Sequence, residues 1–105
     1  MSKKIKINPQ ALNDGEKKYV LRLFVTGLLP NSARAVVNIK AICKKYLKNR
    51  FELEIIDIYQ QPDLASAEEI VAVPVLIKKF PLPEERLVGD LSNTAEVLRG
   101  LSLFN

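Results

Sequence analysis

The side chains that most often carry out enzymatic chemistry are almost absent from this sequence. It contains no histidine and a single cysteine, Cys43. Without histidine there is no Ser-His-Asp or Cys-His nucleophile, no imidazole base and no histidine-ligated zinc. Ser32 would be a weak nucleophile without such a base. A lone cysteine excludes a disulfide framework, and because Cys43 falls on an apolar helical stripe, we expect a buried structural thiol.

Metal and phosphate sites are not indicated either. The acidic residues of the middle of the chain have no recognisable metal-ligand spacing; they are Asp57, Asp63, Glu68 and Glu69. The four glycines are isolated from one another and form no phosphate-binding loop. We therefore expect no metal, no cofactor and no catalytic residue.

Two short segments nevertheless occupy the positions of a redox site. Gly27–Ser32 lies between an apolar strand and an amphipathic helix, and Val73-Pro74-Val75 opens a later apolar strand. Thioredoxin-type enzymes carry a Cys-x-x-Cys pair and a cis-proline at these two places, whereas Leu28 and Asn31 stand here where the thiols would be. Thiol–disulfide exchange by such enzymes requires a cysteine thiolate as the nucleophile. The sequence therefore favours a binding protein, and the alternative is a cysteine-less thioredoxin-like enzyme that uses glutathione.

The first half of the chain has the pattern of a βαβ unit. Tyr19–Thr26 is apolar on both faces apart from Arg22, which predicts a central strand. A helix capped by Asn31 or Ser32 should run to about Lys48. Phe51–Tyr59 should then form a second strand, parallel to the first.

The second half predicts the remainder of an α/β domain. We expect a short helix over Pro62–Glu69, strands at Val75–Ile77 and Arg86–Val88 joined by the turn Phe80–Pro83, and a last helix capped by Ser92. The inward side chains of that last helix should be Ala95, Val97, Leu98 and Leu101. The order β-α-β-α-β-β-α is thioredoxin-like, and its sheet is mixed.

Length, charge and hydropathy limit the class of protein. The 105 residues, 48% of them hydrophobic, suit one domain, which we place at 18–105 after an N-terminal extension, 1–17. No apolar run suits a membrane span or a secretory signal, so we expect a cytoplasmic protein. The net charge of +4 suits an acidic partner surface and is too small to indicate nucleic acid unaided.

Three lysines of the predicted first helix are spaced four residues apart. Lys40, Lys44 and Lys48 should form one column, in which each like-charged pair costs roughly 0.2–0.5 kcal/mol. Two interpretations stay open: a solvated helix face, or a docking surface for an acidic partner.

The end of the chain is ambiguous. Gly100 and Ser102 alternate with Leu101 and Leu103, which is a strand pattern within a segment that otherwise predicts helix. Glu68–Ile77 begins as a plausible helix and yet is rich in β-branched residues. Either tertiary packing overrides these local signals, or the chain has two nearly equal folds.

From Tyr19 to Leu101 the sequence resembles the KaiB family of circadian-clock proteins. The resemblance is carried by Leu21–Gly27 with Pro30-Asn31-Ser32 and Arg34, by Ile56-Asp57-Ile58 with Gln61–Ala65, by Ala72–Leu76, and by Arg86–Ser92. The combination of Pro-Asn-Ser after the first strand with Gly-Asp-Leu-Ser before the last helix is specific to that family.

The resemblance implies a non-enzymatic regulator. It would bind KaiC, a hexameric ATPase and autokinase, and oppose its phosphorylation together with KaiA. The resemblance also implies a metamorphic fold: a resting tetramer whose C-terminal half gives the order β-α-β-β-α-α-β, and a rare binding monomer with the full thioredoxin-like order. We expect the resting form in a crystal. The residues implied in switching are Val73, Pro74, Gly89, Gly100 and Ser102.

A partner-binding surface is expected on the first helix and second strand. Two further basic residues, Arg22 and Arg86, lie outside these two elements. The full expected set is Arg22, Arg34, Lys40, Lys44, Lys48, Phe51 and Arg86. Glu69 stands where the family usually has a lysine, and the family's acidic C-terminal tail is missing. A clock role and a divergent stress-response role with a KaiC of its own both stay open, and these departures favour the second. A KaiA-like protein or a histidine kinase would compete for the partner, and the protein would form a homo-tetramer or dimer.

Overall fold

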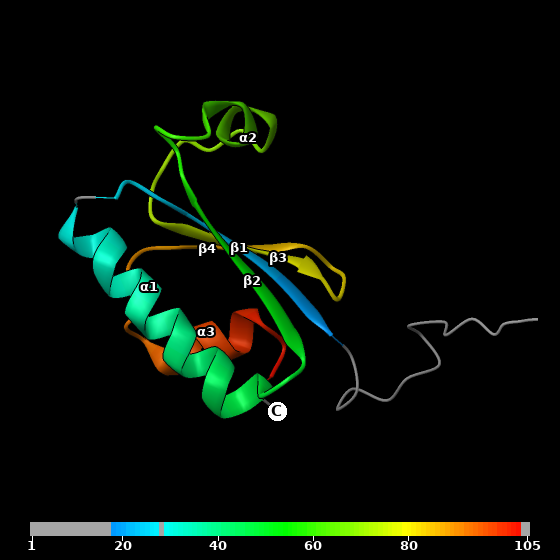
Figure 1. The fold of residues 1–105 in the computed structure, drawn as a ribbon. Coiled ribbons are helices and arrows are strands. Elements are labelled where there is room, and N and C mark those ends of the chain that lie inside the picture. Colours follow the sequence, from blue (N-terminus) through cyan, green and yellow to red (C-terminus); the bar gives the residue numbers. More distant parts are fainter. Residues whose placement is uncertain (1–17, 28, 104–105) are drawn as a thin grey trace, which may run out of the picture.

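The computed structural model describes residues 18–27 and 29–103, where a four-stranded sheet lies between two layers of helix (Figure 1). The predicted extension, residues 1–17, and Leu28 lie outside the described residues. The strands are β1 (Tyr19–Val25), β2 (Phe51–Asp57), β3 (Val75–Phe80) and β4 (Glu85–Val88). The helices are α1 (Pro30–Ile42), a π-helical turn η3 (Cys43–Leu47), α2 (Pro62–Ala67) and α3 (Thr94–Gly100).

The sheet has the order β2-β1-β3-β4, so β1 is a central strand, as predicted. It pairs with β2 in parallel and with β3 antiparallel, and β3 pairs with β4 antiparallel. The predicted mixed sheet is therefore confirmed. Because β1 is covered on both faces, Leu23 and Phe24 are both fully buried although they point to opposite sides.

Each face of the sheet has its own core. The larger core joins Leu21 and Leu23 of β1 to Ile39 of α1 and Leu98 of α3. The smaller core lies on the opposite face, where Phe24 and its neighbours are packed by residues of α2 and the segment that follows it. Figure 1 shows the result: α1 and α3 cover one face, and α2 lies on the other.

The element order is β-α-β-α-β-β-α, which confirms the thioredoxin-like fold class. Of the two arrangements that the resemblance implies, the structure has this one and not the resting arrangement that we expected a crystal to contain. The ambiguous C-terminal segment is helical up to Gly100. Two contacts fix its end: the buried Tyr19 hydroxyl donates to the Leu101 carbonyl (2.7 Å), and the Leu103 N–H donates to the Leu98 carbonyl (2.8 Å).

Both predicted N-caps are wrong. Pro30 begins α1, so the N-cap position falls on Leu29, and the buried Ser32 hydroxyl accepts from the Thr26 N–H instead (3.0 Å). At α3 the capping oxygen belongs to Asn93, whose side chain accepts from the Glu96 N–H (3.2 Å). The helix therefore begins one residue later than a Ser92 cap would give.

Several bounds and one inward position also differ from prediction. Ala95 is exposed, because the buried side of α3 is formed by Val97 and Leu98. The strand β3 extends to Phe80, and α2 ends at Ala67. Pairing with β1 accounts for the longer β3, since Val20 is registered with Phe80.

Candidate partner-binding surface

The structure separates the expected partner-binding residues into three groups. The first group lies along a groove between the end of α1 and the edge strand β2. This groove has a volume of about 550 Å³ and is lined by Lys40, Ala41, Lys44, Phe51 and Leu53. Phe51 and Leu53 are half-buried and pack against the larger core, so the apolar side of the groove is anchored.

Lys48 does not continue the column of lysines. The last turn of the helix is widened into η3, where the Lys48 N–H donates to the Cys43 carbonyl five residues back (2.9 Å). Lys48 itself has φ of 51°, which ends the helix. The expected column of three is therefore a pair, Lys40 and Lys44.

The lysine pair is exposed to solvent. Among the described residues, no carboxylate forms an ion pair with Lys40 or Lys44. The adjacent Lys45 differs, because its ammonium lies over the Tyr46 ring, 5.3 Å from the centroid. The groove thus combines two positive charges with an apolar wall, an arrangement that suits an acidic segment containing an apolar anchor.

The second group is Arg34 and its neighbours. Arg34 Nε donates to Asp90 Oδ2 (3.2 Å), and another guanidinium nitrogen donates to the Asn31 side chain. The Asn38 side chain donates to the Asp90 carbonyl (2.8 Å). Asp90 thereby ties the β4–α3 connection to α1. Hydrogen bonds from Ser92, followed by the one from Arg34, hold the pKa of the Asp90 carboxyl below its usual value.

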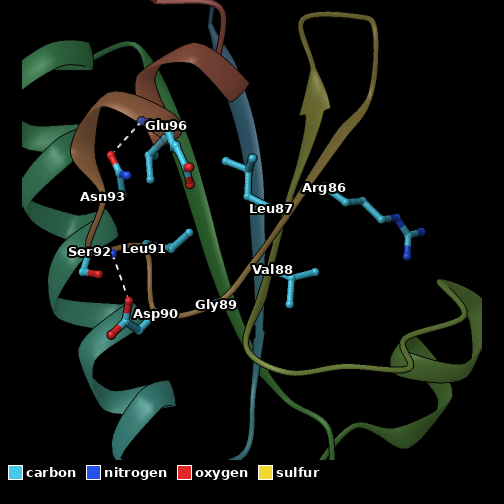
Figure 2. Close-up of a pocket in the computed structure, with 10 residues that line it drawn as sticks. Arg86, Leu87, Val88, Gly89, Asp90, Leu91, Ser92, Asn93 and Glu96 are labelled. Carbon is cyan, nitrogen blue, oxygen red and sulfur yellow. Dashed lines mark hydrogen bonds between the residues drawn. The ribbon is translucent and has the colours of Figure 1, made fainter.

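Asp90 also belongs to a hollow of about 310 Å³ along Arg86–Asn93, with Glu96 and Val97 of α3 (Figure 2). Figure 2 shows Asp90 accepting from the Ser92 N–H (3.0 Å). Gly89 bends the chain here with φ of 119°, a conformation that favours glycine.

The residues implied in switching lie near this connection and at the end of α3. The Gly89 N–H donates to the Pro74 carbonyl (2.9 Å), and the Val73–Pro74 peptide is cis. At Gly100 a Cβ atom would lie 2.5 Å from Leu87 Cδ2, so α3 packs directly on β4 there. Ser102 follows with φ of 62°.

The third group, Arg22 and Arg86, lies on the other face of the sheet. Both guanidinium groups contact Glu68, which follows α2, at 3.5 Å and 3.3 Å. Lys79 of β3 contacts the same carboxylate at 2.8 Å. The hydrogen bond from Lys79 is the main reason that the pKa of Glu68 is below its usual value, with Arg86 and Arg22 adding to it. These arginines therefore stabilise the placement of α2.

Sequence reasoning missed three contributors to these groups. Glu68 is expected only as an acidic residue near the end of a short helix; the grouping of its cations follows from strand register, which places Arg22 and Arg86 on either side of Ile77. Asp90 lies in the segment Arg86–Ser92 that carries the family resemblance, and its contact with α1 is not predicted by the sequence. Ala41 is exposed beside the lysines, and its small size leaves room for the groove.

The turn that corresponds to a redox site is held by a carboxylate. Asp57 Oδ2 accepts from the Gly27 N–H (2.9 Å), and Oδ1 accepts from the N–H groups of Tyr59 (2.8 Å) and Gln60 (3.3 Å). A Cβ atom on residue 27 would lie 2.6 Å from Oδ2. The close approach explains the glycine.

We expect Gly27→Ala to lower the free energy of unfolding by about 1–2 kcal/mol, because the methyl group displaces a carboxylate that three N–H groups hold. Chemical denaturation measures this. In an Asp57→Ala background the same change should cost much less, since the clashing atom is gone. An equal cost in both backgrounds would contradict this explanation.

Cys43 is fully buried in the larger core, which confirms the expected structural thiol. Burial raises the pKa of the thiol to about 12, so almost no thiolate exists near neutral pH. We expect iodoacetamide to label the folded protein at pH 8 at least about 100-fold more slowly than the denatured protein, as mass spectrometry would record. Labelling at the same rate in both states would show a reactive thiol.

Within the described part of the chain, no group of three or more histidine, cysteine, aspartate or glutamate side chains could hold a metal ion. No helix among these residues is long and apolar enough to cross a membrane.

The β-α-β-α-β-β-α order defines a thioredoxin-fold protein, and its sequence carries a single cysteine in place of a cysteine pair. Fasciola hepatica thioredoxin has the same fold (TM-score 0.68, 14% identity, 91% of this chain and 89% of that one). The N-terminal domain of Synechococcus elongatus SasA is similar at 27% identity, with a TM-score of 0.66 over 94% of both chains.

Sequence comparison then identifies the family. The KaiB domain matches residues 22–103, and the chain belongs to the KaiB family. The circadian clock protein KaiB3 of Synechocystis is 44% identical over 86 residues, 82% of this chain and 84% of the relative. The circadian clock oscillator protein KaiB of Thermostichus vulcanus is 45% identical over 88 residues, 84% of this chain and 82% of the relative.

Proposed function

We propose that this protein is a non-enzymatic regulator that binds a KaiC-like hexameric ATPase and autokinase and modulates its phosphorylation. Membership of the KaiB family and the clock names of its relatives support a clock regulatory protein. The observation that carries the binding proposal is the groove beside Lys40, Lys44 and Phe51. Its charge selects an acidic partner surface, and its apolar wall supplies contact area.

Further properties are proposed with it. A KaiA-like protein or a SasA-type histidine kinase would compete for the same partner, since the SasA domain shares this fold. The protein would act in the cytoplasm, and its resting form would be a homo-tetramer or dimer. Val73, Pro74, Gly89, Gly100 and Ser102 would set the balance between two arrangements of the C-terminal half. Glu69 in place of a lysine favours a divergent, stress-related partner.

Size-exclusion chromatography with a KaiC-type hexamer and ATP tests the proposal. We expect a complex that forms over hours and a lower phosphorylated fraction of the hexamer. A cognate hexamer that neither co-elutes after a day nor changes its phosphorylation would refute it. The alternative is a glutathione-dependent activity, to which Cys43 would contribute no thiolate because its side chain is buried with a raised pKa. Disulfide reduction that survives Cys43→Ser would support that alternative.

A further inference from the structure

The edge strand β2 lacks the features that usually keep a sheet edge from pairing. It stands first in the order β2-β1-β3-β4, so no described strand lies on its outer side. It is seven residues long and contains neither lysine nor proline, which protect many exposed edges. The opposite edge, β4, is only four residues long and follows Pro83 closely. The outer side of β2 is therefore open to an added strand.

Two hydrogen bonds show which residues of β2 face outward. The Tyr19 N–H donates to the Arg50 carbonyl (2.7 Å), and the Ile58 N–H donates to the Val25 carbonyl (2.9 Å). Because such contacts fall on every second residue of a parallel pair, the even-numbered residues of β2 bond to β1. The residues whose N–H and C=O groups point away from the sheet are Phe51, Leu53 and Ile55.

The side chains of β2 differ between its two faces. On the face toward α1, the same three residues are apolar, and Ile55 is 36% exposed. On the opposite face, the Glu52 and Glu54 side chains are 63% and 53% exposed and contact Lys18 (2.8 Å) and Arg22 (3.3 Å). Each of these contacts occupies one carboxylate oxygen. A strand that suits this edge therefore alternates apolar with positively charged residues.

The N-terminal extension contains this alternation in Lys4-Ile5-Lys6-Ile7, which we call the Lys-Ile segment. Antiparallel pairing with β2 can bring every lysine opposite a glutamate and every isoleucine opposite an apolar side chain. Residues 8–17 would connect it to the start of β1. They reach up to about 33 Å when extended, whereas the added strand would lie about 10 Å from β1. The resulting pairs are Ile7 with Phe51, Lys6 with Glu52, Ile5 with Leu53, and Lys4 with Glu54.

A second copy of the chain fits this edge less well. Pairing β2 with itself over its full length would place Glu54 opposite its own copy, and like charges directly opposite are destabilising. We propose that the Lys-Ile segment binds the outer edge of β2 in the same chain as an added antiparallel strand. Its isoleucines would lie on the same face as Phe51 and Leu53, so they would also cover the groove beside Lys40 and Lys44. The segment would thereby compete with the partner, and this consequence alone rests on the proposed function.

Hydrogen exchange of the full chain, followed by amide NMR, tests the contact. The N–H groups of Phe51 and Leu53 gain carbonyl partners only if a strand is added. In the wild type they should exchange at least about tenfold more slowly than in Ile5→Lys/Lys6→Ile, which keeps composition and charge but destroys the alternation. Lys4→Glu/Lys6→Glu should remove the protection as well, because like charges then face β2. The control, Leu12→Asn/Asn13→Leu, exchanges two neighbours in the connection and should leave the protection unchanged.

Fast exchange of these two N–H groups in the wild type, or equal protection in the wild type and both variants, would overturn the proposal. Protection that rises with protein concentration would overturn it too, since a second copy would then supply the strand. The competition has its own readout. Tenfold protection means that about one chain in ten is open, so Ile5→Lys/Lys6→Ile should bind the hexamer at least about tenfold more tightly than the wild type. Equal affinities would contradict the covering of the groove, whereas a hexamer that binds neither protein would refute the proposed function and leave the exchange result standing.

Discussion

Replacing Glu68 by glutamine should lower the free energy of unfolding by about 2–3 kcal/mol at neutral pH. The Glu68 side chain is only 14% exposed, and its carboxylate contacts cations on three strands: Arg22, Lys79 and Arg86. Glutamine keeps the size and loses the charge, so three partly desolvated cations lose their common partner. Urea denaturation followed by circular dichroism measures the change.

The same network predicts a pH dependence. Because the folded protein lowers the pKa of Glu68, the folded state binds protons less readily than the unfolded state. The stabilisation is complete above the ordinary glutamate pKa of about 4.3 and disappears as the pH falls through the lower folded value. The stability difference between wild type and Glu68→Gln should therefore stay constant from pH 8 to about pH 5 and shrink below it.

Glu84→Gln is the matched control. Glu84 contacts Lys79 (3.4 Å) and Arg86 (3.9 Å) from the rim of the same network, but its side chain is 39% exposed. Exposed ion pairs contribute little, so this change should cost less than about 1 kcal/mol. Equal costs at the two positions would mean that Glu68 is only one more surface charge.

Reversing the charges of the groove should weaken the proposed partner complex roughly 100-fold. In Lys40→Glu/Lys44→Glu, two attractive contacts with an acidic surface become repulsive while the fold keeps its core, since both side chains are exposed. Surface plasmon resonance against the immobilised hexamer at two salt concentrations measures the affinity. The wild-type affinity should fall with added salt more steeply than that of the variant.

Lys45→Glu provides the control for this variant, because Lys45 lies on the same turn and contacts the Tyr46 ring instead of lining the groove. We expect a change of less than about threefold. If Lys45→Glu weakens the complex as much as the double variant, general positive charge and not the groove attracts the partner.

The fold could be predicted because its signals are local and repeated. Because β1 is apolar on both faces, the sequence predicts a central strand. Because a long helix separates β1 from β2, it also predicts that the two strands pair in parallel. The caps were wrong because Asn31, Ser32 and Ser92 are all suitable capping residues. Which one caps depends on where Pro30 starts α1 and on the contact between Ser32 and Thr26, neither of which is a local preference.

The site was predicted only in part for a similar reason. Lys40, Lys44 and Phe51 do meet, because β2 lies beside the end of α1. Lys48 does not join them, because the π-helical turn η3 displaces it from the column. No recognisable sequence pattern predicts such a turn. The ion pairs of Arg22 and Arg86 with Glu68 could not be predicted, because nothing in the sequence reveals that Glu68 lies over three strands.

The π-helical turn η3 has an evolutionary consequence. Successive residues of an α-helix are about 100° apart around the axis. Deleting one residue within Cys43–Leu47 would relax the turn to an ordinary helix, and the few side chains between the deletion and the helix end at Lys48 would rotate by about that angle. A homologue could thus keep all of its lysines and still present a different charge pattern. Partner choice in such lineages would diverge by insertion and deletion, without any change of amino-acid composition.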